Sequence, residues 1–218
     1  MKNLFLFVTL FFTTLASSQV YHFKSEQNGK SITHRVMLDN HYLVETQYIS
    51  DPPEFVLTRG GYYSEEKGLY QVDLEFNSNY GSDGQKQLSI KKDPSWEEVS
   101  KELLDLNGKW LMAGRMTDQG ERRRDTTGPR NTMKFLNHGY FQWIAFNTES
   151  FQFFGSGGGF YTTNEGVYTE HIEFFSRDNK SVGRVLPFQY SLKGSDWHHQ
   201  GKSSKGLPMH EIWASREH

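Results

Sequence analysis

Apolar and polar residues alternate through short segments of the chain, and each segment ends near glycine, asparagine, aspartate or proline. This alternation predicts half-buried β-strands joined by tight turns, such as the two-residue turn Asn28-Gly29. The first half holds six such segments: 20–24, 32–38, 42–49, 54–63, 69–77 and 87–91. The second half holds eight: 109–116, 132–136, 140–147, 150–161, 167–177, 183–192, 197–201 and 209–214. The pattern predicts an all-β, antiparallel fold.

The pattern repeats at a fixed offset of 98 residues, measured from Gly60 to Gly158. Residues 60–76 are echoed by 158–174, and residues 37–42 by 135–140. Eight strands suffice to close a barrel around one small ligand, whereas six strands in some 75 residues do not. We therefore expect a C-terminal barrel over 106–218 and an N-terminal partial repeat over 19–93. The partial repeat either packs against the barrel or contributes to a shared sheet.

A connecting helix is expected between the repeats, over residues 94–105. Asp93 suits its N-cap, and Pro94 suits its first turn. Its apolar residues Trp96, Val99, Leu103 and Leu104 share one helical face. This face would cover a barrel end or a sheet.

The first 18 residues resemble a secretory signal peptide, with Lys2 before an apolar run and small residues before Gln19. We expect cleavage there and a secreted or periplasmic protein without a membrane span.

The chain has no cysteine, which excludes disulfides and thiolate metal sites. A formal net charge of −2 does not favour nucleic-acid binding. No metal site and no cofactor is predicted.

Leu106-x-Gly108-x-Trp110 opens the first strand of the second half, Trp213 lies in its last strand, and Arg216 follows. This arrangement resembles the lipocalin-like, or calycin, superfamily of antiparallel barrels. The resemblance implies structural roles for Trp110, Trp213 and Arg216, with the guanidinium of Arg216 over the Trp110 indole. Segments 157–161, 172–178 and 197–206 are also similar to uncharacterised secreted bacterial lipocalin-like proteins. The disulfide and the Thr-Asp-Tyr segment of ordinary lipocalins are missing.

Glycine-rich residues 155–159 lack the Lys-Ser/Thr ending of a phosphate loop. Their counterpart Gly60-Gly61 favours a structural turn or bulge.

In strand 167–177, one face carries Tyr168, Glu170, Ile172 and Phe174, and the other carries Thr169, His171, Glu173 and Phe175. If the second face lines a cavity, His171 and Glu173 form a candidate proton-transfer pair. If that face is solvated, as the matching residues Gln71, Asp73 and Glu75 suggest, they do not.

His198 and His199 are adjacent, so only one of them can face a cavity; His198 joins the catalytic candidates. Candidate ligand-binding residues are Phe141, Trp143, Phe153, Tyr161 and Lys202. Three functions fit: binding of a small apolar or mixed-polarity ligand, cofactor-independent isomerase or lyase chemistry, or an envelope interaction module without a pocket. The oligomeric state is left open.

Overall fold

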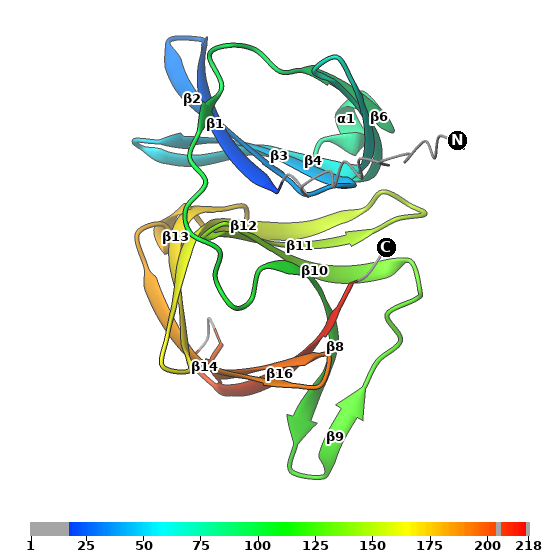
Figure 1. The fold of residues 1–218 in the computed structure, drawn as a ribbon, viewed down its shortest axis with the longest axis vertical. Coiled ribbons are helices and arrows are strands. Elements are labelled where there is room, and N and C mark those ends of the chain that lie inside the picture. The colour runs from blue at the N-terminus through cyan, green and yellow to red at the C-terminus, as the bar shows by residue number, and fades with distance from the viewer. Residues whose placement is uncertain (1–17, 204–205, 217–218) are drawn as a thin grey trace, which may run out of the picture.

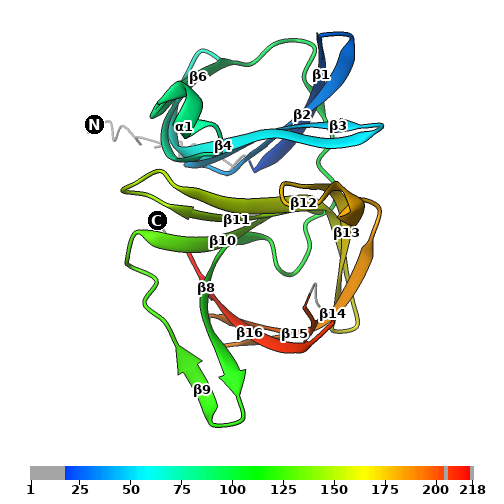
Figure 2. The same ribbon diagram turned by 180° about the vertical axis from the view of Figure 1, so that it is seen from behind.

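The computed structural model describes residues 18–203 and 206–216. The predicted signal peptide therefore lies outside the described residues, apart from Ser18. Two β-sheets stack on one another in Figure 1, with the curled first sheet above and a barrel below. The view from behind in Figure 2 shows the same two layers in contact along β4, β11 and β12.

The N-terminal sheet has seven antiparallel strands in the order β6-β5-β4-β3-β2-β1-β7. The strands are β1 (Gln19–Gln27), β2 (Lys30–Leu38), β3 (Tyr42–Ser50), β4 (Pro53–Glu66), β5 (Leu69–Asn77), β6 (Gln87–Lys91) and β7 (Glu97–Glu98). Asn28 and Gly29 form the predicted hairpin turn, and both have positive φ angles, 52° and 73°. A short helix, α1 (Tyr80–Asp83), lies between β5 and β6.

The C-terminal sheet closes into a barrel because β8 pairs with both β16 and β10. Its strands are β8 (Gly108–Thr117), β9 (Gly120–Arg123), β10 (Arg130–Asn137), β11 (Tyr140–Asn147), β12 (Phe153–Asn164), β13 (Val167–Phe175), β14 (Val185–Lys193), β15 (Asp196–Lys202) and β16 (Pro208–Ser215). A 3₁₀ turn, η1 (Asn179–Ser181), precedes β14. β9 forms a hairpin with β8 outside the closed ring. The eight-strand meander confirms the predicted all-β, lipocalin-like fold class.

The expected helix over 94–105 is absent, and this part of the prediction is wrong. The segment has a turn near each end and no helical residue, and β7 within it pairs with Tyr21 and His22 of β1. Trp96 stacks on Phe23, with ring centres 5.1 Å apart, across the concave face of the first sheet. The backbone of Val99 bonds to β1 rather than to its own segment. Backbone pairing with β1 thus takes the place of helical hydrogen bonds, and the stacking of Trp96 on Phe23 fixes the segment against the first sheet.

Both repeats carry a β-bulge at the same place, as the paired glycines predicted. Register shifts occur between Gly60 and Gly61 and between Gly158 and Gly159. A side chain on Gly61 would collide with the carbonyl of Asp73, and one on Gly159 with that of His171. Glycine therefore permits the close approach of the two strands.

The two sheets pack face to face through a shared apolar cluster. The first sheet contributes Val20, Met37, Tyr42, Val44 and Phe76, and the barrel contributes Met133, Phe135, Tyr140, Ile144 and Phe146. Tyr42 and Tyr140 occupy matched positions of the repeat, as do Phe135 and Met37. The two repeats form separate sheets that bury the same face against each other.

Candidate functional site

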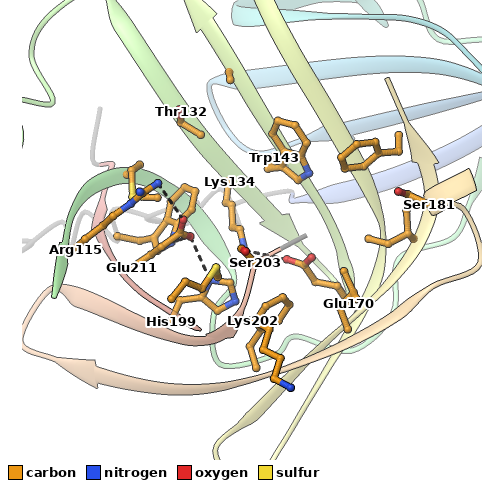
Figure 3. Close-up of a pocket in the computed structure, with 18 of the residues that line it drawn as sticks. Arg115, Thr132, Lys134, Trp143, Glu170, Ser181, His199, Lys202, Ser203 and Glu211 are labelled. Atoms are coloured by element: carbon orange, nitrogen blue, oxygen red, sulfur yellow. Dashed lines mark hydrogen bonds and ion pairs between the residues drawn. The ribbon is translucent and has the colours of Figure 1, made fainter. Parts of the chain in front are cut away.

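The barrel encloses a cavity of about 540 Å³, shown in Figure 3. Its lining comes from β8, β10, β11, β13, β14, β15 and β16, so the cavity lies in the barrel lumen. The size falls within the range of small-molecule sites. Much of the wall is apolar, including Met112, Trp143, Ile172, Phe175, Phe188 and Trp213.

A buried ion pair lies inside this cavity. Lys134 Nζ is 2.8 Å from Glu170 Oε1, and both side chains are less than a tenth exposed. The hydroxyl of Tyr168 donates a second hydrogen bond to Glu170, at 3.0 Å. The ammonium also lies 4.8 Å from the ring centre of Trp197, a cation–π distance. Surrounding aromatic rings and two hydrogen bonds thus hold the Glu170 carboxylate and the Lys134 ammonium in place.

His199 is the second polar group of the lumen, and it lies beside Glu211. Its Nδ1 is 3.5 Å from Glu211 Oε2, whereas its buried Nε2 has no hydrogen-bond partner among residues 18–203 and 206–216. Burial, followed by the nearby Lys134 charge, lowers the pKa of His199 to about 4. The imidazole is therefore neutral near pH 7, with one donor and one acceptor nitrogen.

The cavity opens at the end of the barrel where the β8–β10, β13–β14 and β15–β16 connections meet. Six exposed cationic side chains contribute to its lining: Arg115, Arg124, Arg130, Arg177, Arg184 and Lys202. Two carboxylates, Glu170 and Glu211, belong to the described lining, and both already contact cations or histidine within the protein. The mouth is accordingly basic.

The predicted ligand-binding residues are divided between three locations. Trp143 and Lys202 line the cavity. Phe141 and Tyr161 are buried in the apolar cluster that fills the rest of the barrel interior. Phe153 lies between the sheets instead, where its ring is parallel to that of Phe55 at 6.2 Å.

The three candidate catalytic residues do not converge. His171 lies outside the lumen and stacks on Phe160, with ring centres 4.2 Å apart. Glu173, also outside, forms an ion pair with Arg35 of the first sheet. His198 Nδ1 is 2.9 Å from His210 Nε2, away from the cavity that His199 lines. The Tyr168–Glu170–Ile172 face points inward, so of the two alternatives for strand 167–177 the structure has the one in which His171 and Glu173 do not line the cavity.

The three structural candidates depart in part from the family pattern. Trp110 donates its indole N–H to the carbonyl of Leu106 at 2.8 Å and packs in the barrel core. Trp213 forms part of the cavity wall. Arg216 lies over the ring of Tyr42, at 5.3 Å, and forms a bidentate ion pair with Glu75, rather than covering Trp110. It turns toward the first sheet, where the partly buried Glu75 carboxylate lies.

The lumen residues Lys134 and Glu170 replace valines of the first repeat. At the offset of 98, Lys134 corresponds to Val36 and Glu170 to Val72. Val36 and Val72 share one apolar cluster in the N-terminal sheet. The paired replacement of two valines by opposite charges was the sequence signal for this site. Alternation alone hides it, since a lysine within a strand normally indicates an exposed face.

Within the described ranges, no group of three or more histidine, aspartate or glutamate side chains is arranged to hold a metal ion. The same residues contain no helix that is long and apolar enough to cross a membrane. The cavity in the barrel lumen is the candidate site.

The closed meander and its lumen define a lipocalin-like barrel protein. Residues 105–217, just over half of the chain, match the family model described as "Domain of unknown function (DUF4488)", and the chain belongs to this family. No curated protein matches the chain. Among solved structures, the chain is similar to a lipocalin-like protein from Bacteroides uniformis ATCC 8492, with 14% identity and a TM-score of 0.35. That likeness covers 51% of this chain and 98% of the other.

Proposed function

We propose that this protein binds a small organic ligand of mixed polarity in the lumen of its C-terminal barrel. One observation carries the proposal: a cavity of about 540 Å³ combines an apolar wall with His199, a buried side chain whose Nε2 lacks a hydrogen-bond partner among the described residues. Leaving a buried polar group unpaired costs free energy. A ligand that bonds to His199 and covers Trp143 and Trp213 would recover this cost.

The barrel interior supports binding more than the two alternative functions. An interaction module without a pocket does not account for the cavity. Proton transfer through His171, Glu173 and His198 would need these side chains to converge, and they lie apart and outside the lumen.

Native mass spectrometry of the protein purified from its own source tests the proposal. We expect a co-purifying small molecule that dissociates on collisional activation. Ala145→Phe, which fills the lumen from β11, should abolish the complex, because Ala145 lines the cavity. Thr169→Phe introduces the same aromatic ring on the outward face of β13 and serves as the control. Equal retention of the molecule by both variants would place it outside the barrel and refute the proposal.

A further inference from the structure

The charge of the barrel mouth differs sharply from the charge of the whole molecule. The chain has 24 lysines and arginines against 26 aspartates and glutamates. The described lining of the cavity holds seven lysines and arginines against two glutamates. The imbalance is thus local to the lumen and its entrance. A concave site lined by one sign of charge focuses the electrostatic potential and attracts the opposite charge.

Three of these arginines are held close together by neutral groups. Arg177 donates two hydrogen bonds to the carbonyl of Phe154, at 2.9 and 2.7 Å. Arg124 donates to the carbonyl of Arg130 at 2.8 Å. Arg130 lies 3.7 Å from the ring centre of Phe154. Burial, together with the charges of Arg124 and Arg177, lowers the pKa of Arg130.

None of these three guanidinium groups is paired with a carboxylate within residues 18–203 and 206–216. Like charges crowded in this way raise the free energy of the empty site, and a bound anion would lower it. The guanidinium group of Arg184, also in the lining, has no hydrogen-bond or ion-pair partner among those residues.

We propose that the ligand of the barrel is an organic anion, with an acidic head group at the arginine-lined mouth and an apolar or aromatic body in the lumen. This inference rests on the function proposed above and names its ligand class. Trp143 lies at the junction of the two regions. Its ring is in the cavity wall, and the Arg177 guanidinium lies 5.4 Å from the ring centre. The apolar body then extends toward Phe188 and Trp213.

Two fluorescent probes that differ by one charged group test the assignment. 1-Anilinonaphthalene-8-sulfonate carries a sulfonate, and N-phenyl-1-naphthylamine has the same rings without it. We expect the full-length protein to bind the anionic probe at least about tenfold more tightly at low salt. The difference should shrink as salt is raised, because exposed charges are screened. Decanoate and decyl phosphate should displace the anionic probe, and their relative strength distinguishes a carboxylate from a phosphate head group. 1-Decanol should compete less well.

Arginine substitutions locate the head group. Arg184→Gln and Arg124→Gln should each weaken the anionic probe by about 2- to 5-fold, as expected for partly solvated charge pairs. Binding of the neutral probe should not change. The charge-preserving Arg184→Lys should restore most of the loss. Arg122→Gln removes an exposed arginine that does not line the cavity and should have no effect.

The outcomes separate the two proposals. Equal affinity for both probes, with Ala145→Phe removing both, would overturn the anionic assignment and leave ligand binding in the lumen intact. Anionic-probe binding that survives Ala145→Phe and all arginine substitutions would overturn it as well, since the probe would then sit elsewhere. Failure of both probes and of all three decyl compounds to bind would count against the proposed function itself.

Discussion

The pair Lys134–Glu170 shows how two substitutions between the repeats turn an apolar cluster into a polar site. In the first sheet the matching valines pack in an apolar cluster, while in the barrel the charges face a cavity. Burying an ion pair gives little net stability, because desolvation offsets the attraction. The pair is therefore better understood as a feature of the proposed ligand site than as a source of folding stability.

Replacing one member of this pair should be costly, and replacing both should not. We expect Lys134→Met to lower the free energy of unfolding by about 3 kcal/mol, since it leaves the Glu170 carboxylate uncompensated. Lys134→Met with Glu170→Leu should recover most of that loss. Urea unfolding of the single and double variants measures the coupling. If the double variant is as unstable as the sum of the singles, the two charges do not stabilise each other.

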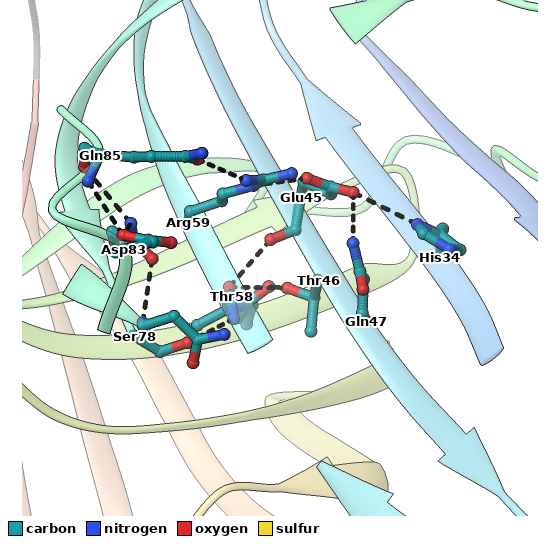
Figure 4. A network of polar contacts seen from close by, with 12 residues as sticks. His34, Glu45, Thr46, Gln47, Thr58, Arg59, Ser78, Asp83 and Gln85 are labelled. Atoms are coloured by element: carbon teal, nitrogen blue, oxygen red, sulfur yellow. Dashed lines mark hydrogen bonds and ion pairs between the residues drawn. The ribbon is translucent and has the colours of Figure 1, made fainter. Parts of the chain in front are cut away.

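A second polar cluster, shown in Figure 4, is centred on Glu45 of the first sheet. Glu45 accepts hydrogen bonds from Arg59 at 2.8 Å and Gln47 at 2.9 Å, and lies 3.2 Å from His34 Nδ1. Ser25 Oγ is 2.8 Å from the other nitrogen of His34. Burial alone would raise the pKa of Glu45, but His34 and Arg59 outweigh it and lower the pKa to about 2.

This shift predicts a defined loss of stability in acid. The folded protein binds the Glu45 proton less readily than the unfolded chain does, so the contribution is complete above about pH 4.5. It is lost as the pH falls to about 2, and its full size is about 3 kcal/mol. Urea unfolding from pH 6 to 2 should show a smaller pH dependence for Glu45→Gln. Glu54→Gln, on an exposed pair with Lys30, should retain the full dependence; identical profiles for all three proteins would exclude Glu45 as the source.

At the scale of the element, each bulge places two consecutive side chains of β5 or β13 on the face between the sheets. On β13, Glu173 meets Arg35, and the next residue, Phe174, packs against the first sheet. On β5, Glu75 meets Arg216, and the next residue, Phe76, packs in the apolar cluster shared by the two sheets. Each repeat therefore supplies a carboxylate to an arginine of the other.

The bulge glycines should not tolerate a side chain. We expect Gly159→Ala to destabilise the protein by about 2 to 4 kcal/mol, because the new methyl group meets the carbonyl of His171. Gly61→Ala should behave similarly in the first repeat. Gly81→Ala is the control, since nothing lies within 4 Å of its added Cβ. Thermal unfolding of the three variants gives the comparison, and a Gly159→Ala protein as stable as Gly81→Ala would show that the bulge can rearrange.

At the scale of the molecule, the two sheets stack face to face, so each repeat buries the apolar face of the other. The shared apolar cluster draws five fully or largely buried residues from each sheet. Three ion pairs cross the same interface: Arg35–Glu173, Arg216–Glu75 and Lys109–Asp39. Exposing these ten residues to water would cost free energy if either sheet unfolded alone. We therefore expect the two sheets to fold together.

The coupling predicts one cooperative unfolding transition. Hydrogen exchange followed by mass spectrometry should show β2 and β11 losing protection at the same urea concentration. Glu75→Gln weakens the bidentate contact with Arg216. It should lower the free energy of unfolding by about 2 kcal/mol and shift the urea midpoints of β2 and β11 down together. Glu121→Gln, on an exposed pair in the β8–β9 hairpin, should leave both unchanged. Two separate midpoints would show that the sheets fold independently.

The amino-acid sequence determined the strands, the hairpin turn at Asn28-Gly29, the repeat and its bulges, because these depend on alternation and on glycine within a few residues. Only the tertiary structure decided the conformation of segment 94–105. Its sequence pattern is helical, but the segment pairs with β1, and Trp96 stacks on Phe23. The tertiary structure also decided that His199, rather than His198, faces the lumen, and that Lys134 meets Glu170. These outcomes depend on barrel closure and on contacts between distant residues, which a local pattern does not specify.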